Sequence, residues 1–125
     1  MRTLIQGEIT DFTPTFKACL RKEGLLLGEK GDIFLTIDTG FSGGIALPQG
    51  MLDEMNLELI GYDTFSLATG KVIELPMFLG KVVIKAHEVE TWFVPGDLLL
   101  GMEFLSMVGE VLTLDFGKAM VELKG

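Results

Sequence analysis

Asp38-Thr39-Gly40 is the segment of this 125-residue chain whose residue types best fit catalytic chemistry. The aspartate supplies a carboxylate that can take up or release a proton, and the glycine permits a tight turn beside it. The tripeptide alone is a weak signal, because ordinary turns also use Asp to accept hydrogen bonds from backbone amides. Its surroundings must decide between a turn and a catalytic loop.

Apolar segments flank the tripeptide on both sides. The β-rich segment Phe34–Ile37 leads into Asp38, and the apolar segment Ile45–Pro48 follows after Ser42-Gly43-Gly44. Further along the chain, Leu99-Leu100-Gly101 precedes a segment with helical spacing of its apolar residues. The pattern therefore predicts a strand that delivers Asp38, a second strand after it, and a distant apolar pair with glycine before a helix.

This order of elements resembles the retropepsin-like aspartic proteases. The fuller segments Asp38–Pro48 and Leu99–Leu105 are similar to those of the bacterial and archaeal single-domain branch of that family. The resemblance implies an all-β fold: a retropepsin-like closed β-barrel with one short helix after the hydrophobic-hydrophobic-Gly motif. It also implies one domain over residues 1–125.

The resemblance assigns roles to particular residues. It makes Asp38 the catalytic carboxylate, Thr39 and Gly40 the rest of the active-site loop, Leu100 and Gly101 the support of that loop, and Ala68, Thr69, Gly70 and Lys71 the flap that covers substrate. Thr39 is expected to form hydrogen bonds across a two-fold axis. The flap is expected to exclude water from the bound peptide.

The implied activity is that of an aspartic endopeptidase acting on peptides or proteins as a homodimer. In such enzymes two carboxylates share one proton and hold one water between them, and no covalent intermediate forms. The chain has a single Asp-Thr-Gly, and 125 residues leave no room for a second lobe. A two-fold dimer supplies the second carboxylate from Asp38 of the other subunit.

Two departures from the family pattern keep other functions open. Phe41 stands where members often have Ala or Ser, and a bulky residue there could narrow the site or select small substrates. The flap has only Gly70 near its tip. The alternative function is a catalytically weak retropepsin-fold module that binds peptides or assembles partners. A third is an unrelated small β-barrel with a chance Asp-Thr-Gly turn.

Composition restricts partners and location. The net charge of −8 and pI of about 4.5 argue against nucleic acid, because a phosphate backbone would be repelled. Hydrophobic residues make up 48% of the chain, which suggests apolar surface that a partner subunit covers. The N-terminus lacks a signal peptide and no apolar segment is long enough to cross a bilayer, so we expect a cytoplasmic protein with no membrane partner.

Cys19 and His87 are the only residues of their types, and neither suggests a site. One cysteine cannot form an intrachain disulfide, which fits a reducing compartment. Nothing brings Cys19 and His87 together as a thiol and its base, and His87 is expected in a hairpin turn. No His, Cys, Asp and Glu pattern has metal-ligand spacing, so neither metal nor cofactor is expected.

Glycines divide the chain into short apolar segments of strand length. Helices are expected over Met102–Val108 and, opened by Pro48, through Leu57. The resemblance implies that the first and last strands interleave between subunits, which would cover otherwise exposed edges. The expected strands are Leu4–Ile9, Thr15–Leu20, Asp32–Ile37, Ile45–Leu47, Tyr62–Leu67, Val72–Leu79, Lys81–Ala86, Val89–Val94, Val111–Phe116 and Ala119–Leu123, and Leu25–Leu27 is expected near a turn.

Overall fold

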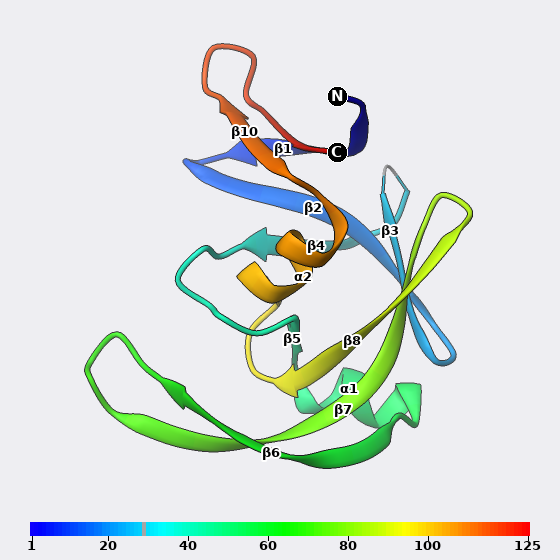
Figure 1. Cartoon of the computed structure of the whole chain (residues 1–125), viewed down its shortest axis with the longest axis vertical. Coiled ribbons are helices and arrows are strands. Elements are labelled where there is room, and N and C mark those ends of the chain that lie inside the picture. The colour runs from blue at the N-terminus through cyan, green and yellow to red at the C-terminus, as the bar shows by residue number, and fades with distance from the viewer. Residues whose placement is uncertain (29) are drawn as a thin grey trace.

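Short strands joined by turns make up most of the computed structural model, which describes residues 1–28 and 30–125 (Figure 1). The strands are β1 (Thr3–Thr10), β2 (Thr13–Arg21), β3 (Gly24–Gly28), β4 (Ile33–Ile37), β5 (Ile45–Leu47), β6 (Glu58–Ser66), β7 (Val72–Ile84), β8 (His87–Pro95), β9 (Leu99–Leu100), β10 (Val111–Asp115) and β11 (Met120–Lys124). The helices are α1 (Gln49–Met55) and α2 (Met102–Val108).

Seven of the strands close into a barrel. The order around it is β2, β3, β7, β8, β5, β9 and β4, and β4 pairs back with β2. The pairs β3–β7, β4–β9 and β5–β8 are parallel, and the others around the ring are antiparallel. The predicted all-β fold with a closed barrel and a short helix after Gly101 is confirmed.

Alternating side chains fill the interior of the barrel. Phe16 on β2 and Phe93 on β8 are fully buried, as is Phe104 on α2, which packs into the same hydrophobic core. Because successive residues of a strand point to opposite faces, such a period of two places one face inward and the other toward solvent. The barrel is therefore a packed core.

The terminal strands pair with each other inside the chain. β1 lies antiparallel to β11, from Thr3 opposite Lys124 to Glu8 opposite Met120, and β10 takes the other edge of β11. Within one chain each terminal strand therefore has a pairing partner, and the interleaving of these strands between subunits stays a prediction. Among the described residues, the strand at the end of this part of the sheet is β10.

β6 and β7 form a long antiparallel arm that extends below the barrel in Figure 1. β7 is one strand of 13 residues, so the predicted break at Gly80 is wrong. Gly80 serves close packing instead, since a Cβ there would lie 2.6 Å from the ring of Phe93. The turn after β7 is Lys85-Ala86, and His87 begins β8 as an exposed residue.

The helices are short and end where the sequence permits. α1 follows Pro48 and stops at Asn56, whose left-handed φ of 52° closes the last turn. α2 starts directly after Gly101 and buries Phe104 and Leu105. No helix in the part of the chain that the structure describes is long and apolar enough to span a membrane.

Candidate active site

Asp38 lies at the end of β4, where the barrel holds its backbone firmly. β4 runs parallel to β9, with Ile37 opposite Leu100, and the Asp38 N–H donates to the Leu100 carbonyl at 3.0 Å. The Asp38 carboxylate accepts a hydrogen bond at Oδ1 from the Gly40 N–H at 2.9 Å. Pairing with β9 thus fixes the backbone position of Asp38, and the hydrogen bond from Gly40 within the turn orients its carboxylate.

Gly101 allows a close approach beneath the Asp38 loop. Its N–H donates to the Gly44 carbonyl at 2.7 Å, and the Met102 N–H donates to the Phe41 carbonyl at 2.8 Å. A Cβ on Gly101 would collide with the Gly43 carbonyl oxygen. Only glycine therefore lets the segment before α2 pair so closely with the loop.

The β6–β7 arm carries the predicted flap at its tip. Leu67 and Lys71 close the turn, with the Leu67 N–H donating to the Lys71 carbonyl at 2.8 Å, and the Gly70 N–H donates back to Leu67 at 2.9 Å. Gly70 has a φ of +84°, a conformation that glycine adopts without strain. Ala68, Thr69, Gly70 and Lys71 are all exposed.

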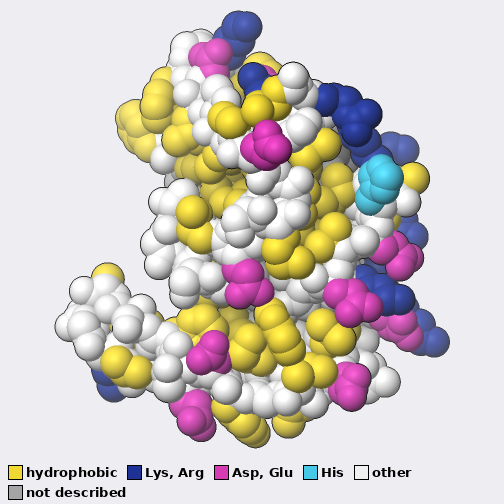
Figure 2. Space-filling model, viewed as in Figure 1, with side chains coloured by type: hydrophobic (Ala, Val, Ile, Leu, Met, Phe, Trp, Pro, Cys, Tyr) yellow, Lys and Arg dark blue, Asp and Glu magenta, His cyan; other side chains and the backbone are white. Residues whose placement is uncertain are grey.

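A groove of about 760 Å³ separates this arm from the Asp38 loop. Figure 2 shows the hollow between the projecting arm, at the lower left, and the body of the molecule. Three segments of the chain form its walls: the loop after β4, the β6–β7 arm, and the barrel strands with the turn after β8. Its lining residues are Asp38, Gly40, Phe41, Ser42, Ala46, Thr64, Phe65, Ser66, Leu67, Ala68, Ile73, Leu75, Val94, Pro95, Gly96, Asp97 and Leu99.

The groove brings together only some of the predicted site residues. Asp38, Gly40 and Ala68 line it, which places the carboxylate and the arm on one cavity. Leu100 is buried behind the loop and Gly101 lies under it. The remaining predicted residues are exposed outside the lining: Thr39 on the loop, and Thr69, Gly70 and Lys71 at the tip of the arm.

The lining is acidic at two points and otherwise apolar or small. Asp38 is partly buried, Asp97 is exposed, and none of the described residues that line the groove is Lys, Arg or His. Two negative carboxylates without a basic neighbour in the wall give the groove a negative field. Neutral polar groups such as Thr64 and Ser66 line the side formed by the arm.

Sequence reasoning did not identify most of the lining residues, among them Phe65 and Asp97. The turn after β8 places the exposed Asp97 in the lining of the groove. Phe65 contacts Phe41 across the groove, with ring centroids 5.9 Å apart. No local pattern could have found Phe65, because its position depends on how the arm folds over the loop.

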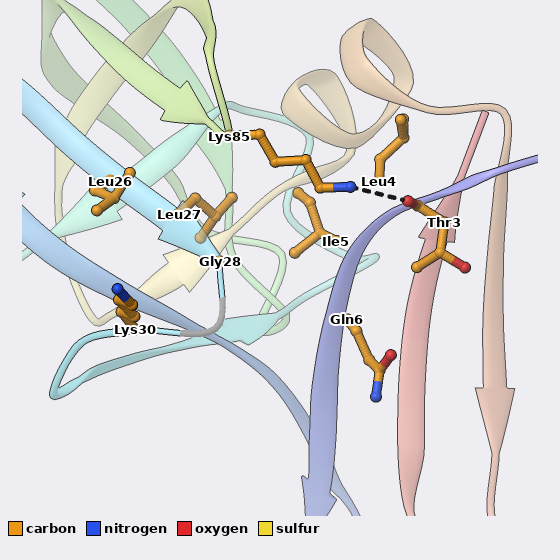
Figure 3. A pocket seen from close by; sticks show the side chains of 9 residues that line it. All are labelled: Thr3, Leu4, Ile5, Gln6, Leu26, Leu27, Gly28, Lys30 and Lys85. Carbon is orange, nitrogen blue, oxygen red and sulfur yellow. Dashed lines mark hydrogen bonds between the residues drawn. The ribbon is translucent and has the colours of Figure 1, made fainter.

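A second cavity of about 450 Å³ lies away from Asp38, between β1 and the end of β3 (Figure 3). The Lys85 Nζ donates to the Thr3 carbonyl at its edge, at 3.5 Å. None of the predicted site residues lines this cavity, which holds lysines but no carboxylate among its described lining residues. The Asp38 groove is therefore the better candidate for acid–base chemistry.

Comparison of the chain with models of known protein families, with curated proteins and with solved structures gives no match. The candidate site therefore depends on the residues and geometry of this chain. Among residues 1–28 and 30–125, no group of three or more His, Cys, Asp or Glu side chains lies close enough together to hold a metal ion.

Proposed function

We propose that the protein is a retropepsin-like aspartic endopeptidase that acts as a homodimer. The observation that carries this proposal is the position of the Asp38 carboxylate, on a groove that the β6–β7 arm covers from the other side. A carboxylate on a covered cleft can act on a bound substrate while the cover keeps bulk water away. The motif resemblance to aspartic proteases assigns the same residue to catalysis.

The groove suits an extended peptide. Its length follows the arm from Thr64 to Ala68, and apolar side chains such as Leu75 and Val94 can receive the side chains of a substrate. Small polar groups on the arm, including Ser66, offer hydrogen bonds to a peptide backbone. The substrate class we propose is therefore a peptide or an unfolded segment of a protein.

The proposed reaction is general acid–base hydrolysis by two Asp38 carboxylates, one from each subunit. The ionised carboxylate takes a proton from the water that adds to the peptide carbonyl carbon, and the protonated one gives its proton to the carbonyl oxygen. Breakdown of the resulting diol transfers a proton to the leaving amine nitrogen. No bond to the enzyme forms, and the two carboxylates finish with one proton between them.

Exposed apolar side chains near the loop support a dimer. Met102 and Met107 on α2 are 44% and 52% exposed, and Val111 and Leu114 on β10 are 41% and 42% exposed. Met102 adjoins the Asp38 loop through its hydrogen bond to Phe41. Exposed apolar side chains are what a second subunit would cover, and Thr39 is exposed on the loop, where it could meet the same residue of that subunit.

We also propose a cytoplasmic location. Cys19 is the single cysteine of the chain, and it is a free thiol. A fold that is stabilised without disulfides suits a reducing compartment.

A specific observation favours the alternative function, a weakly catalytic peptide-binding or assembly module. The rings of Phe41 and Phe65 meet across the groove and occupy space beside Asp38. A substrate must share that space with them. Binding without efficient cleavage would result if the scissile bond could not approach the carboxylate.

The test of the proposed function is an Asp38→Asn variant with Asp97→Asn as its matched control. Both substitutions remove one negative charge from the same groove, but only the first removes the proposed catalyst. Parent and variants are incubated with a mixed peptide library from acidic to neutral pH, and the products are identified by mass spectrometry. Circular dichroism and light scattering verify that all three share the same fold and assembly.

We expect Asp38→Asn to lower cleavage by roughly 10²–10⁴-fold or more, because the general base is lost in both subunits. Asp97→Asn should change cleavage far less, because Asp97 lines the groove but is not one of the two proposed catalytic carboxylates. Activity of the parent should have a bell-shaped pH dependence, because one carboxylate must be charged and the other protonated. Cleavage at the same bonds and rate by Asp38→Asn would exclude Asp38 as the catalyst, and folded dimers that bind peptides without cutting them would favour the binding module.

A further inference from the structure

Phe41 and Phe65 approach each other from opposite sides of the candidate groove. Phe41 follows Asp38-Thr39-Gly40 directly, and Phe65 lies on β6 opposite Ile73 of β7. Their ring centroids are 5.9 Å apart with an interplanar angle of 43°, which is a favourable tilted aromatic contact. Both residues line the groove and both are only partly buried.

The ring of Phe41 fills space that two glycines leave open. A Cβ on Gly43 would lie 2.7 Å from Phe41 Cζ, and a Cβ on Gly101 would lie 2.7 Å from Phe41 Cδ2. Neither glycine has a side chain that could move into that space if the ring were removed. Loss of the Phe41 ring would therefore leave a hole that opens into the groove beside Asp38.

We propose that Phe41, together with Phe65, is a steric filter that determines substrate specificity. The two rings restrict the subsite next to Asp38 to small side chains, those of Gly, Ala or Ser, and exclude aromatic and branched ones. For cleavage this inference rests on the proposed function. For binding it requires only that the groove takes a peptide.

The groove's other features favour a filter over a purely structural pair. Phe16, Phe93 and Phe104 form the aromatic core and are fully buried, whereas Phe41 and Phe65 face a cavity. Neighbouring side chains cover the rings of Phe41 and Phe65 only in part. A substrate bound in the groove would therefore contact the exposed parts of the rings. Pocket walls discriminate side-chain size by roughly 10-fold to 200-fold for each methylene group.

The test compares the parent with Phe41→Ala on peptides that differ only in the side chain beside the scissile bond, from Ala through Leu to Phe. We expect the parent to prefer Ala, and Phe41→Ala to raise kcat/KM for the Leu and Phe peptides at least about tenfold relative to the Ala peptide. Such a gain cannot result from a loss of folding. Phe34→Ala, which removes a partly exposed ring on β4 outside the groove, is the matched control and should keep the parent's preference.

Two further variants keep the proposal testable if Phe41→Ala folds poorly. Phe65→Ala removes the filter from the side of the arm, and Phe41→Leu reduces the ring without emptying the space. Both should shift the preference in the same direction, with Phe41→Leu the weaker. Unchanged preference in all variants that fold would overturn the filter while leaving the peptidase intact.

Binding separates this inference from the proposed function. The same peptides, carrying a fluorophore, are titrated against Asp38→Asn alone and combined with Phe41→Ala, and anisotropy gives the affinities. If Asp38→Asn binds the peptides with small side chains more tightly, and the added Phe41→Ala substitution removes that preference, the filter is supported even if the parent cleaves no peptide. A groove that binds none of the peptides, or binds them irrespective of size, would overturn the filter.

Discussion

The Asp38 loop and the tip of the β6–β7 arm face the same groove but are held in different ways. The loop is bonded to other parts of the barrel, because Asp38 pairs with Leu100 and the Gly44 carbonyl accepts from Gly101. The tip is bonded to itself through Leu67 and Lys71, and every residue from Ser66 to Val72 is exposed. One side of the candidate site is anchored and the other is free to adjust.

This difference separates the proposed chemistry from the covering of substrate. A carboxylate that must meet a partner across a two-fold axis requires a fixed backbone. A cover that admits and releases a peptide must open at low cost, and exposed segments with few contacts open most easily. Substitutions that disrupt the backbone pairing of the loop should therefore lower stability and activity together, whereas substitutions in the tip should lower activity more than stability.

Gly101→Val should have the largest effect. Its side chain would collide with the Gly43 carbonyl and the Phe41 ring, so the loop and the start of α2 must separate. We expect a loss of about 3 kcal/mol or more in the free energy of unfolding, measured in urea, and no detectable cleavage. Gly61→Val on β6, where a Cβ meets nothing within 4 Å, is the control; equal stability of the two variants would show that the loop is not anchored.

Gly70→Val should reduce turnover more than stability. Valine is strained at a φ of +84°, at a cost of about 1 kcal/mol, but no neighbouring atom lies within 4 Å and the tip can rearrange. A rearranged tip would cover the peptide poorly, so kcat/KM should fall roughly 10-fold to 100-fold. Unchanged kcat/KM would remove the assignment of Ala68–Lys71 as a flap.

Thr39→Ala should have the smallest effect, which acts through assembly of the dimer. Thr39 is exposed on the loop, and loss of its proposed hydrogen bonds across the axis should weaken the dimer about tenfold. Thr39→Ser keeps the hydroxyl and serves as the control. Analytical ultracentrifugation over a range of concentrations measures the dimer dissociation constants of the parent and both variants. Equal constants for the parent and Thr39→Ala would mean that Thr39 does not stabilise the dimer.

Local sequence patterns predicted most of the strands and helices but not which strands pair to close the barrel. On β11 the buried residues Val121 and Leu123 alternate with half-buried ones, and this period of two identifies a strand without identifying its partners. The pairing of β2 with β4, and of β5 with β9, joins segments that only the folded barrel brings together. The predicted break at Gly80 is wrong for a related reason: Gly80 packs against Phe93 of a neighbouring strand, whereas a glycine in the sequence alone suggests a turn.

The candidate site likewise combines features that the sequence predicts with features that depend on the fold. The placement of Asp38 beside Leu100 follows from two short motifs that the sequence displays, and the structure pairs them directly. The contact of Phe41 with Phe65, and the position of Asp97 on the groove, depend on the path of the arm and of the turn after β8. Neither spacing nor residue type carries that information.

The central claim, catalysis by paired Asp38 carboxylates, is tested most directly by mixing subunits. Parent and Asp38→Asn chains are unfolded together and refolded at a constant total concentration, so that subunits combine at random. If each site needs an Asp38 from both subunits, the cleavage rate must fall as the square of the parent fraction. The Asp97→Asn chain, mixed in the same proportions, controls for dilution and refolding losses. A rate that falls only in proportion to the parent fraction would mean that one chain carries the whole catalytic site, which contradicts the paired mechanism.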